Sequence, residues 1–173
     1  MLFKDGKFYG DNFSFAFPNE CYFRLDASDQ DIQVFEFIKK ELSVLYHIEI
    51  IFDKLTKGSL CESMNEKIDG MDCIPDSQIL PITRGSKSGV AAYYHHAISN
   101  FYEERYQVKD SNKEFLISFS IWTSLLDDPN LKEQLMGIND ENYIVEHFKK
   151  VPIQEVLTRQ EVKEFFNSII LTE

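Results

Sequence analysis

Alternating apolar and polar residues predict that the first two-thirds of the chain consists mostly of β-strands. Phenylalanines at positions 13, 15 and 17 alternate with Ser14 and Ala16, which is the two-residue period of a strand with one buried face, and Pro18 ends the run. Residues 46–53 and 115–122 alternate in the same way. Less regular apolar runs indicate further strands at residues 21–25, 32–38, 90–98 and 101–108.

Two capping-box sequences predict helices, because in this spacing a Ser or Thr hydroxyl and a Glu carboxylate bond to reciprocal backbone amides. Ser59 and Glu62 predict a helix over residues 59–69, and Thr158 and Glu161 predict a helix at the C-terminus. The second helix continues with apolar residues at the i, i+3, i+4, i+7 spacing of a helix packed on a sheet, namely Val162, Phe165, Phe166 and Ile169. Between these helices, Asp128-Pro129 and Gly137 predict a short helix, and residues 140–150 a further turn or two.

Strands followed by helices, rather than strict βα alternation, predict an α+β fold with a mainly antiparallel β-sheet flanked by helices. The length suits a single domain spanning residues 1–173. Apolar residues make up 43% of the chain, with 15 Phe and 8 Tyr, so a continuous core can be buried. Only 7 Gly and 5 Pro are present, and no low-complexity linker divides the chain.

The order of these elements resembles the Mog1/PsbP-like family of α/β/α sandwiches. The run Phe13-Ser-Phe-Ala-Phe-Pro18 is similar to the family's first strand, which ends in Pro before a second strand. The helix at 59–69 falls where the family has a helix between the halves of its sheet. A late hairpin, a long strand and a C-terminal helix ending Phe166-Asn-Ser-Ile-Ile170 complete the likeness. Residues 128–157 are longer and more helical than the family's core requires.

This resemblance implies the sandwich fold and a role in binding rather than chemistry. One named type in the family acts with a nuclear-transport GTPase, and the other with the photosynthetic oxygen-evolving complex. Neither role transfers to this chain on fold alone, because one fold hosts many functions.

The charge balance narrows the range of partners. The formal net charge is −11 and the sequence pI is near 4.8. Nucleic acids are bound by neutralising phosphates with Lys and Arg, so no nucleic-acid partner is expected. The acidity favours solubility and, beyond that, a basic protein partner or a bound cation. No run approaches the 18 apolar residues of a membrane span, so no membrane partner is expected either.

The three cysteines, Cys21, Cys61 and Cys73, are odd in number and lack CxxC spacing. This usage is typical of reduced thiols in a cytosolic protein rather than of a disulfide framework or a zinc site. The first residues lack the basic and apolar regions of a signal peptide, which also favours a cytoplasmic location. Residues 26–31 have acidic spacing but lack the Gly and the distal Glu of a calcium-binding loop. We therefore expect no metal and no cofactor.

The segment Thr83–Val108 carries most of the candidate chemistry. If Ser99-Asn100 forms a two-residue turn, the flanking strands pair so that the two residue numbers sum to a constant. The resulting pairs are His96 with Glu103, His95 with Glu104, Tyr94 with Arg105, and Tyr93 with Tyr106. The adjacent histidines point to opposite faces of the strand and cannot hold one metal ion together.

Each histidine would then face its own glutamate, and this allows two interpretations. A nearby carboxylate favours the imidazolium form, which suits a pH-responsive or general-acid pair. The alternative is a set of cross-strand charge pairs that stabilise the sheet by roughly 0.2–1 kcal/mol each.

Residues 84–89, Arg-Gly-Ser-Lys-Ser-Gly, are similar to a phosphate-binding loop but lack the Gly-Lys pair and the following helix of a P-loop. We interpret them as a hairpin loop from which Arg84 and Lys87 can contact an anion or a partner. No catalytic residue is assigned. The candidate ligand or partner surface consists of Arg84, Lys87, Tyr93, His95, His96, Glu103, Glu104 and Arg105.

Three functional hypotheses follow. The leading one is a soluble, non-enzymatic binding or accessory domain, bacterial in origin, that acts on a protein partner. The first alternative is an immunity-type inhibitor whose clustered acidic surface blocks a basic toxin with salt-sensitive binding. The second is a small hydrolase-like enzyme that uses a His–Glu pair, which requires those side chains to converge in a cleft with another polar group. The partner, the ligand and the oligomeric state stay open.

Overall fold

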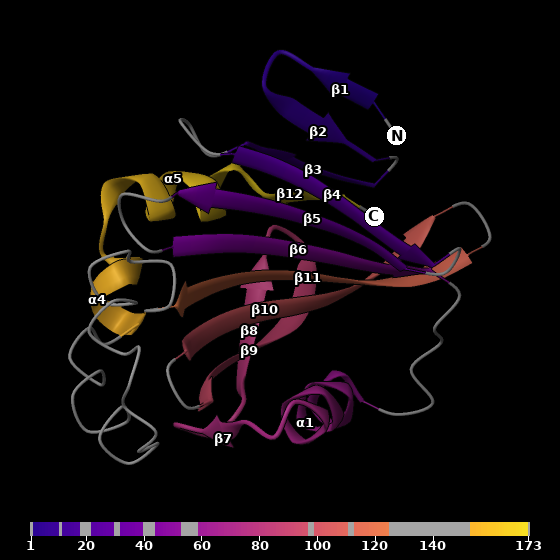
Figure 1. Ribbon diagram of the computed structural model, residues 1–173. Helices are drawn as coiled ribbons and strands as arrows, with labels where there is room; N and C mark the ends of the chain where they lie inside the picture. Colours follow the sequence, from indigo (N-terminus) through magenta and orange to yellow (C-terminus); the bar gives the residue numbers. More distant parts are fainter. Residues whose placement is uncertain are drawn as a thin grey trace.

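The computed structural model describes residues 2–10, 12–17, 22–29, 32–39, 44–52, 59–96, 99–110, 113–124 and 153–172. In chain order its elements are β1 (Leu2–Lys4), β2 (Lys7–Tyr9), β3 (Phe13–Ala16), β4 (Tyr22–Asp29), β5 (Ile32–Lys39), β6 (Val44–Phe52), α1 (Leu60–Gly70), β7 (Ile74–Pro75), β8 (Leu80–Arg84), β9 (Lys87–His96), β10 (Ser99–Asp110), β11 (Lys113–Ser124), α4 (Ile153–Leu157), α5 (Gln160–Ser168) and β12 (Ile170–Leu171). Figure 1 shows α1 below the larger sheet and the β1–β2 hairpin at the opposite end of the molecule.

The larger sheet has the order β4-β5-β6-β11-β10-β9-β7, and β8 also pairs with β9. All of these pairs are antiparallel. Its central strand, β11, alternates as predicted, with one buried set of side chains on each face. The apolar set consists of Phe115, Ile117, Phe119 and Ile121, and the other includes Leu116, Ser118 and Ser120. Both faces of the sheet are therefore covered.

The smaller sheet has the order β1-β2-β3-β12 and joins the first described strands to the last. Its inner face is formed by residues that are almost fully buried, namely Phe8, Phe13, Phe15 and Leu171. Burying a phenyl side chain of this kind contributes roughly 1.5–3 kcal/mol. The β1–β2 turn is made by Asp5 and Gly6, both with positive φ (53° and 71°). Asp-Gly is a preferred pair for such a two-residue hairpin turn.

Helix α1 covers one face of the larger sheet. The predicted capping box is confirmed, since Glu62 N donates to Ser59 Oγ (3.2 Å) and Ser59 N donates to Glu62 Oε2 (2.7 Å). Met64 and Ile68 face inward and are buried. They form a core cluster with Cys73, Val90, Ala92, Tyr94 and Phe101.

Helix α5 lies on the other face, with the smaller sheet and α4. Its predicted apolar stripe is confirmed, because Val162, Phe165, Phe166 and Ile169 are all buried. The predicted capping box at its start is wrong: the N-cap is Arg159 and makes no side-chain capping bond. Thr158 cannot cap α5 because its hydroxyl donates to the carbonyl of Glu155 (2.7 Å) and ends α4 instead.

The α+β fold with a mainly antiparallel sheet flanked by helices is confirmed by these elements. The helices predicted at 128–137 and 140–150 lie outside the described residues. The sequence reading missed β1, β2, β7, β8, α4 and β12. Within the described ranges, no helix has the length and apolar character needed to cross a membrane.

Candidate functional site

The β9–β10 hairpin has a different register from the predicted one. Strand β9 ends at His96 and β10 begins at Ser99, so the connection lies two residues earlier than Ser99-Asn100. The observed pairs are His96 with Ser99, His95 with Asn100, Ala92 with Glu103, and Ala91 with Glu104. The predicted His95–Glu104 and His96–Glu103 pairs, and those of Tyr94 with Arg105 and Tyr93 with Tyr106, are therefore wrong. The observed pairing is offset from the predicted one by an even number of residues, so each side chain still lies on the expected face of the sheet.

Glu103 lies on the face covered by α1 and is fully buried. Three side chains, two cationic and one phenolic, donate hydrogen bonds to its carboxylate. Lys67 Nζ donates to Oε1 at 3.3 Å, Arg105 Nη2 to Oε1 at 2.9 Å, and Tyr94 Oη to Oε2 at 2.7 Å. A buried carboxylate needs such partners, because an unpaired charge in the core is costly.

The charge of Glu103 is stable despite its burial. Desolvation alone would raise the pKa of this carboxyl, but the charges of Lys67 and Arg105 and the hydrogen bond from Tyr94 outweigh it and lower the pKa to about 2. The pKa of the Tyr94 phenol is raised, by burial first and then by the Glu103 charge. Glu103 is thus an ionised structural carboxylate at neutral pH and a poor proton donor or acceptor.

The same cluster fastens α1 to the sheet. Arg105 Nη1 donates to both the carbonyl and the hydroxyl of Ser63 at 2.7 Å, and its Nε donates to Ser118 Oγ at 3.1 Å. Lys67, one turn further along α1, also pairs with Glu49 of β6 at 2.7 Å. Two inward positions of the helix are therefore held by charged groups of the sheet.

Glu104, the next residue, lies on the opposite face and forms a second cluster. Arg84 Nη2 donates to Glu104 Oε2 at 2.7 Å, and the hydroxyls of Tyr106 and Tyr102 donate to Oε2 and Oε1 at 2.7 and 2.9 Å. Burial followed by the Glu104 charge raises the pKa of both phenols. Burial lowers the pKa of Arg84, but the charge of Glu104 and the hydrogen bonds to Glu104 and Tyr106 together raise it more. Gly89 makes room for this cluster, because the Tyr106 ring lies where a side chain of residue 89 would be.

Arg84 also joins this cluster to α5. Its Nη1 donates to the carbonyl of Phe166 at 2.5 Å, and the guanidinium lies 5.9 Å from the centre of the Phe166 ring. Cations are favourable near a helix C-terminus, where carbonyls lack partners within the helix. The two adjacent glutamates of β10 therefore each hold a different helix.

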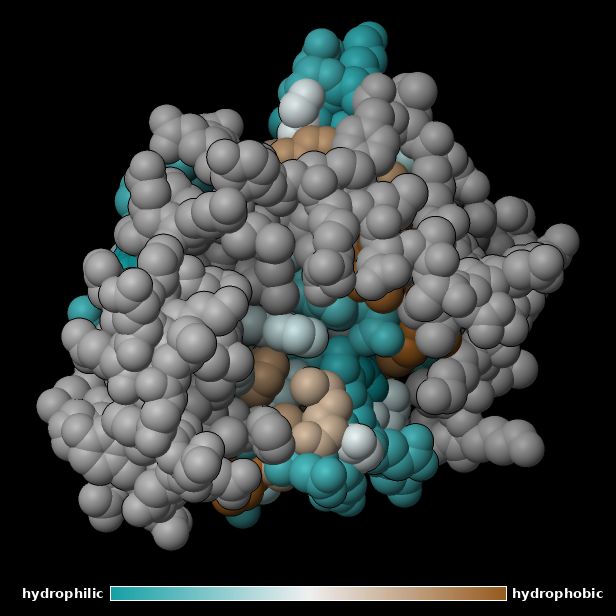
Figure 2. Space-filling model, viewed as in Figure 1, coloured by the Kyte–Doolittle hydropathy of each residue, from teal (hydrophilic) through white to brown (hydrophobic). Residues whose placement is uncertain are grey.

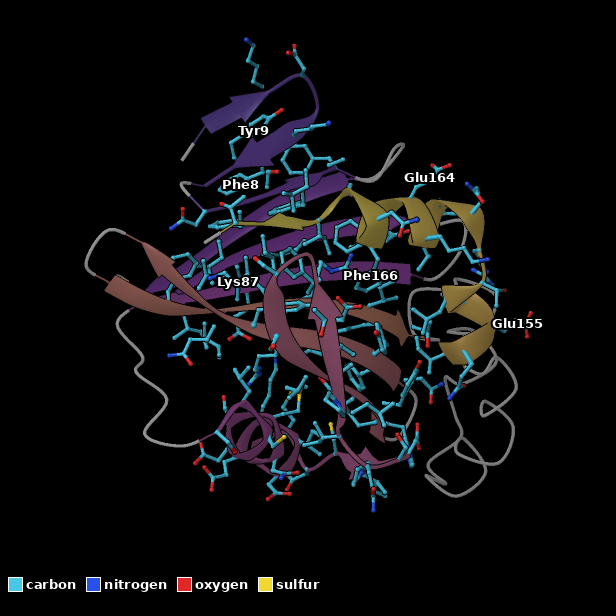
Figure 3. The ribbon with its side chains drawn as sticks, turned by 180° about the vertical axis from the view of Figure 1, so that it is seen from behind. Phe8, Tyr9, Lys87, Glu155, Glu164 and Phe166 are labelled. Atoms are coloured by element: carbon cyan, nitrogen blue, oxygen red, sulfur yellow. The ribbon has the colours of Figure 1, made fainter. Side chains whose placement is uncertain are left out.

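The other described residues of the candidate ligand or partner surface lie at or near the molecular surface. His95 Nδ1 contacts Asp76 Oδ1 at 2.5 Å, not a glutamate. Tyr93 is half-buried and its ring packs against Tyr102 at 4.9 Å. Lys87 is half-buried beside the two-residue β8–β9 turn, opposite Arg84 (Figure 3). The side chain of His96 lies outside the described part. The seven candidate residues whose side chains are described thus divide among two buried clusters and the surface.

Sequence reasoning missed a polar row across the middle strands on the α1 side. Ser120 of β11 is paired with His47 on one side and Glu103 on the other. These three residue types form the catalytic triad of many hydrolases. Here, however, the Ser120 hydroxyl donates to the backbone carbonyl of His47 (3.1 Å), and the His47 ring stacks on Trp122 at 4.6 Å. The row is buried and is held by structural contacts rather than arranged as a nucleophile and base.

The outer surface of α1 carries only acidic charge. Glu62, Glu66 and Asp69 recur at i, i+4 and i+7, which places them on one exposed stripe, and Asp72 follows, also exposed. Lys67 is the only basic residue from position 59 to 76 and points inward. We call the surface formed by Glu62, Glu66, Asp69 and Asp72 the acidic face. Figure 2 shows hydrophilic residues along the lower edge of the molecule, where α1 lies.

Metal-binding side chains are not grouped in the described part of the chain: no three or more His, Cys, Asp or Glu residues there could hold an ion together. Cys61 is exposed and Cys73 is buried, and both are free thiols. Burial, followed by the charge of Asp72, raises the pKa of the Cys73 thiol, which makes it a poor nucleophile at neutral pH. Cys21 lies outside the described residues.

Comparison with known proteins gives a likeness of fold. No protein-family model matches the sequence, and no curated protein matches it. Among solved structures, a mutant of the protein Mog1 is similar over 100% of this chain and 97% of its own, with 12% sequence identity and a TM-score of 0.48. A protein from Bacteroides thetaiotaomicron VPI-5482 is similar over 97% of this chain and 48% of its own, with 10% identity and a TM-score of 0.39. The first of these belongs to the family that the sequence resembles.

Proposed function

We propose that this chain is a non-enzymatic binding domain for a protein partner, and that the acidic face receives a cationic surface of that partner. The observation that carries the proposal is the sorting of charge on α1. Carboxylates occupy the exposed stripe, while the only lysine of the segment is used inside the molecule. Clustered charge of one sign steers an oppositely charged partner and selects against others.

The attachment of α1 supports this proposal. A binding surface is most effective when its side chains are held in place before the partner arrives. The contacts of Ser63 and Lys67 with Arg105, Glu49 and Glu103 fix the inward side of the helix. The carboxylates of the outward side are thereby presented by a rigid element rather than by a loop.

A matched pair of variants tests the proposal. Glu66→Gln/Asp69→Asn removes two charges from the acidic face, and Glu155→Gln/Glu164→Gln removes two exposed charges from α4 and α5 (Figure 3). The partner is first captured from a cell extract with the immobilised chain, purified, and then titrated by calorimetry at low and moderate salt. We expect the first variant to lose about tenfold or more in affinity, which is ~1.4 kcal/mol, and the second to bind like the parent. Equal binding by both variants would contradict the proposal.

The immunity-type inhibitor is the second candidate. It requires clustered rather than scattered acidic residues, and the acidic face is such a cluster. Its test is specific: co-expression with a basic toxin encoded beside this gene should restore growth, and Glu66→Gln/Asp69→Asn should abolish the rescue. A neighbouring toxin whose activity is unaffected by the chain would leave only the general binding role.

A further inference from the structure

The outer face of the smaller sheet has a character unlike the rest of the described surface. Tyr9, Ser14 and Ile170 form one cross-strand row, since Ser14 pairs with both of the others. Tyr9 is 39% exposed and Ile170 is 55% exposed. Lys4 and Lys7 are paired with each other on the same face, one row away. We call the surface formed by Lys4, Lys7, Tyr9 and Ile170 the lysine face.

Most of the exposed cationic side chains in the described part of the chain lie there. Among the side chains that the structure describes, only Lys4, Lys7 and Lys163 are exposed cations. Asp5, in the turn between the two lysines, offsets part of their charge. Lys163 lies between Glu161 and Glu164 along α5. The lysine face therefore differs in sign from the net charge of −11 and adds two exposed apolar side chains.

Figure 1 shows the β1–β2 hairpin, which carries Lys4, Lys7 and Tyr9, at one end of the molecule and α1, which carries most of the acidic face, at the other. We propose that the acidic face of one copy of this chain docks on the lysine face of a second copy, in a reversible head-to-tail contact. The complementary charges give the contact its orientation. Tyr9 and Ile170 supply apolar anchors, and Ile74, which is 59% exposed and follows Asp72 by two residues, supplies one on the other side.

Such a contact has a recognisable dependence on concentration. A head-to-tail interface uses two different patches and does not close on itself in a dimer, so further copies can add. The mean mass should rise gradually with concentration above the 20.3 kDa of one chain rather than stop at twice that value. The contact does not require the proposed partner but uses the same acidic face, so a bound partner should displace the second copy.

The strength of association should pass through a maximum as the salt concentration rises. At about 0.01 M salt, repulsion between two net charges of −11 acts over ~30 Å and opposes approach. At about 0.1 M this repulsion is screened beyond ~10 Å, while the closer Lys–carboxylate pairs keep more of their attraction. At about 1 M those pairs are screened as well. An apolar contact would instead strengthen steadily with salt.

Charge reversal provides the test, read by sedimentation velocity over a range of concentrations at these three salt levels. Lys4→Glu/Lys7→Glu and Glu66→Lys/Asp69→Lys should each be monomeric alone, because the first presents acidic side chains at both ends and the second leaves the acidic face without net charge. Their equimolar mixture should associate again. The control Glu155→Lys/Glu164→Lys has the same net charge of −11 + 4 = −7 as the second variant and should associate like the parent. Circular dichroism verifies folding, and Lys4→Gln/Lys7→Gln replaces the first variant in the single-variant comparison if it unfolds.

Two results would overturn the inference. One is a parent chain that stays monomeric at every salt level up to about 1 mM protein. The other is association that survives both charge reversals, grows steadily with salt and disappears in Tyr9→Ser/Ile170→Ser, which would indicate a two-fold apolar contact between smaller sheets. Neither result affects capture of the proposed partner, which is measured separately.

Discussion

At the scale of single residues, Glu103 shows how an acidic side chain can be both fully buried and charged. Its pKa of about 2 lies below the 4.5 of an ordinary Glu because Lys67, Arg105 and Tyr94 stabilise the anion more than burial destabilises it. A depressed pKa contributes stability that is present above the unfolded-state pKa and is lost as the pH falls through the folded-state value. For Glu103 this window runs from about pH 5 down to pH 2, and the contribution is roughly 3 kcal/mol.

Replacing Glu103 with Gln should therefore destabilise the chain most near neutral pH. We expect a loss of about 3–5 kcal/mol at pH 7, because Arg105 is left buried without its carboxylate and Lys67 keeps only Glu49. The difference from the parent should shrink as the pH falls toward 2. Urea unfolding at pH 7, 5 and 3 measures it, with the exposed change Glu66→Gln as a control. A difference that does not vary with pH would show that Glu103 is not ionised in the folded chain.

The prediction with the clearest steric cause concerns Gly89. A Cβ at this position would lie 2.4 Å from Cδ1 of Tyr106 and 2.7 Å from the carbonyl oxygen of Arg105. Gly89→Ala should displace the Tyr106 ring, disturb the Glu104 cluster and cost about 2 kcal/mol or more. Gly70→Ala, where nothing lies within 4 Å, should be neutral or slightly stabilising. Thermal unfolding compares the two, and equal melting temperatures would contradict this account.

Sequence reasoning singled out Glu103 and Glu104 but not the residues that they contact. The register error in the β9–β10 hairpin arose because Ser99-Asn100 is a good turn sequence, whereas the strands separate two residues earlier. The true partners of Glu103 and Glu104, Lys67 and Arg84, are distant in sequence (36 and 20 residues) and meet only when α1 and β8 pack on the sheet. No local pattern encodes such a contact.

At the scale of elements, Arg84 connects the β8–β9 hairpin with the end of α5. Lys keeps the charge at this position but lacks the planar fork that reaches Glu104 and the Phe166 carbonyl together. Arg84→Lys should loosen the last turn of α5 more than the sheet. Hydrogen exchange should show about tenfold or greater loss of protection at residues 165–169, with β6 and β11 little changed. Uniform loss across all elements would instead indicate a general destabilisation.

Element prediction succeeded where a strand or helix has one strong period. The alternation in β11, the capping box of α1 and the apolar stripe of α5 are each written locally in the sequence. The β1–β2 hairpin was missed although Asp5-Gly6 is a strong turn signal, because its strands have only three residues each. Strand β12 has two residues and is recognisable only by its pairing with β3.

At the scale of the whole molecule, the short pairing of β12 with β3 links distant parts of the chain. Leu171 is buried in the main core beside Phe13, and Thr172 N donates to the carbonyl of Asn12 at 2.9 Å. Ending the chain after Ile169 should cost about 2–4 kcal/mol through the lost apolar burial and strand pairing. We also expect faster hydrogen exchange in β3. Leu171→Ala, which keeps the backbone pairing, should lose stability but keep more of the β3 protection.

The adjacency of Glu103 and Glu104 also selects the correct register of β10 during folding. A slip of β10 by one residue would turn each carboxylate to the wrong face, away from its own cations, and leave several charges buried without partners. A slip by two residues would restore the faces but move each carboxylate by about 7 Å, beyond the reach of Lys67 or Arg84. Apolar residues tolerate the two-residue slip better, because it keeps their faces and hydrophobic contacts lack direction. Two neighbouring charges with separate partners thus make β10 intolerant of single-residue insertions or deletions, even where the overall apolar pattern would survive them.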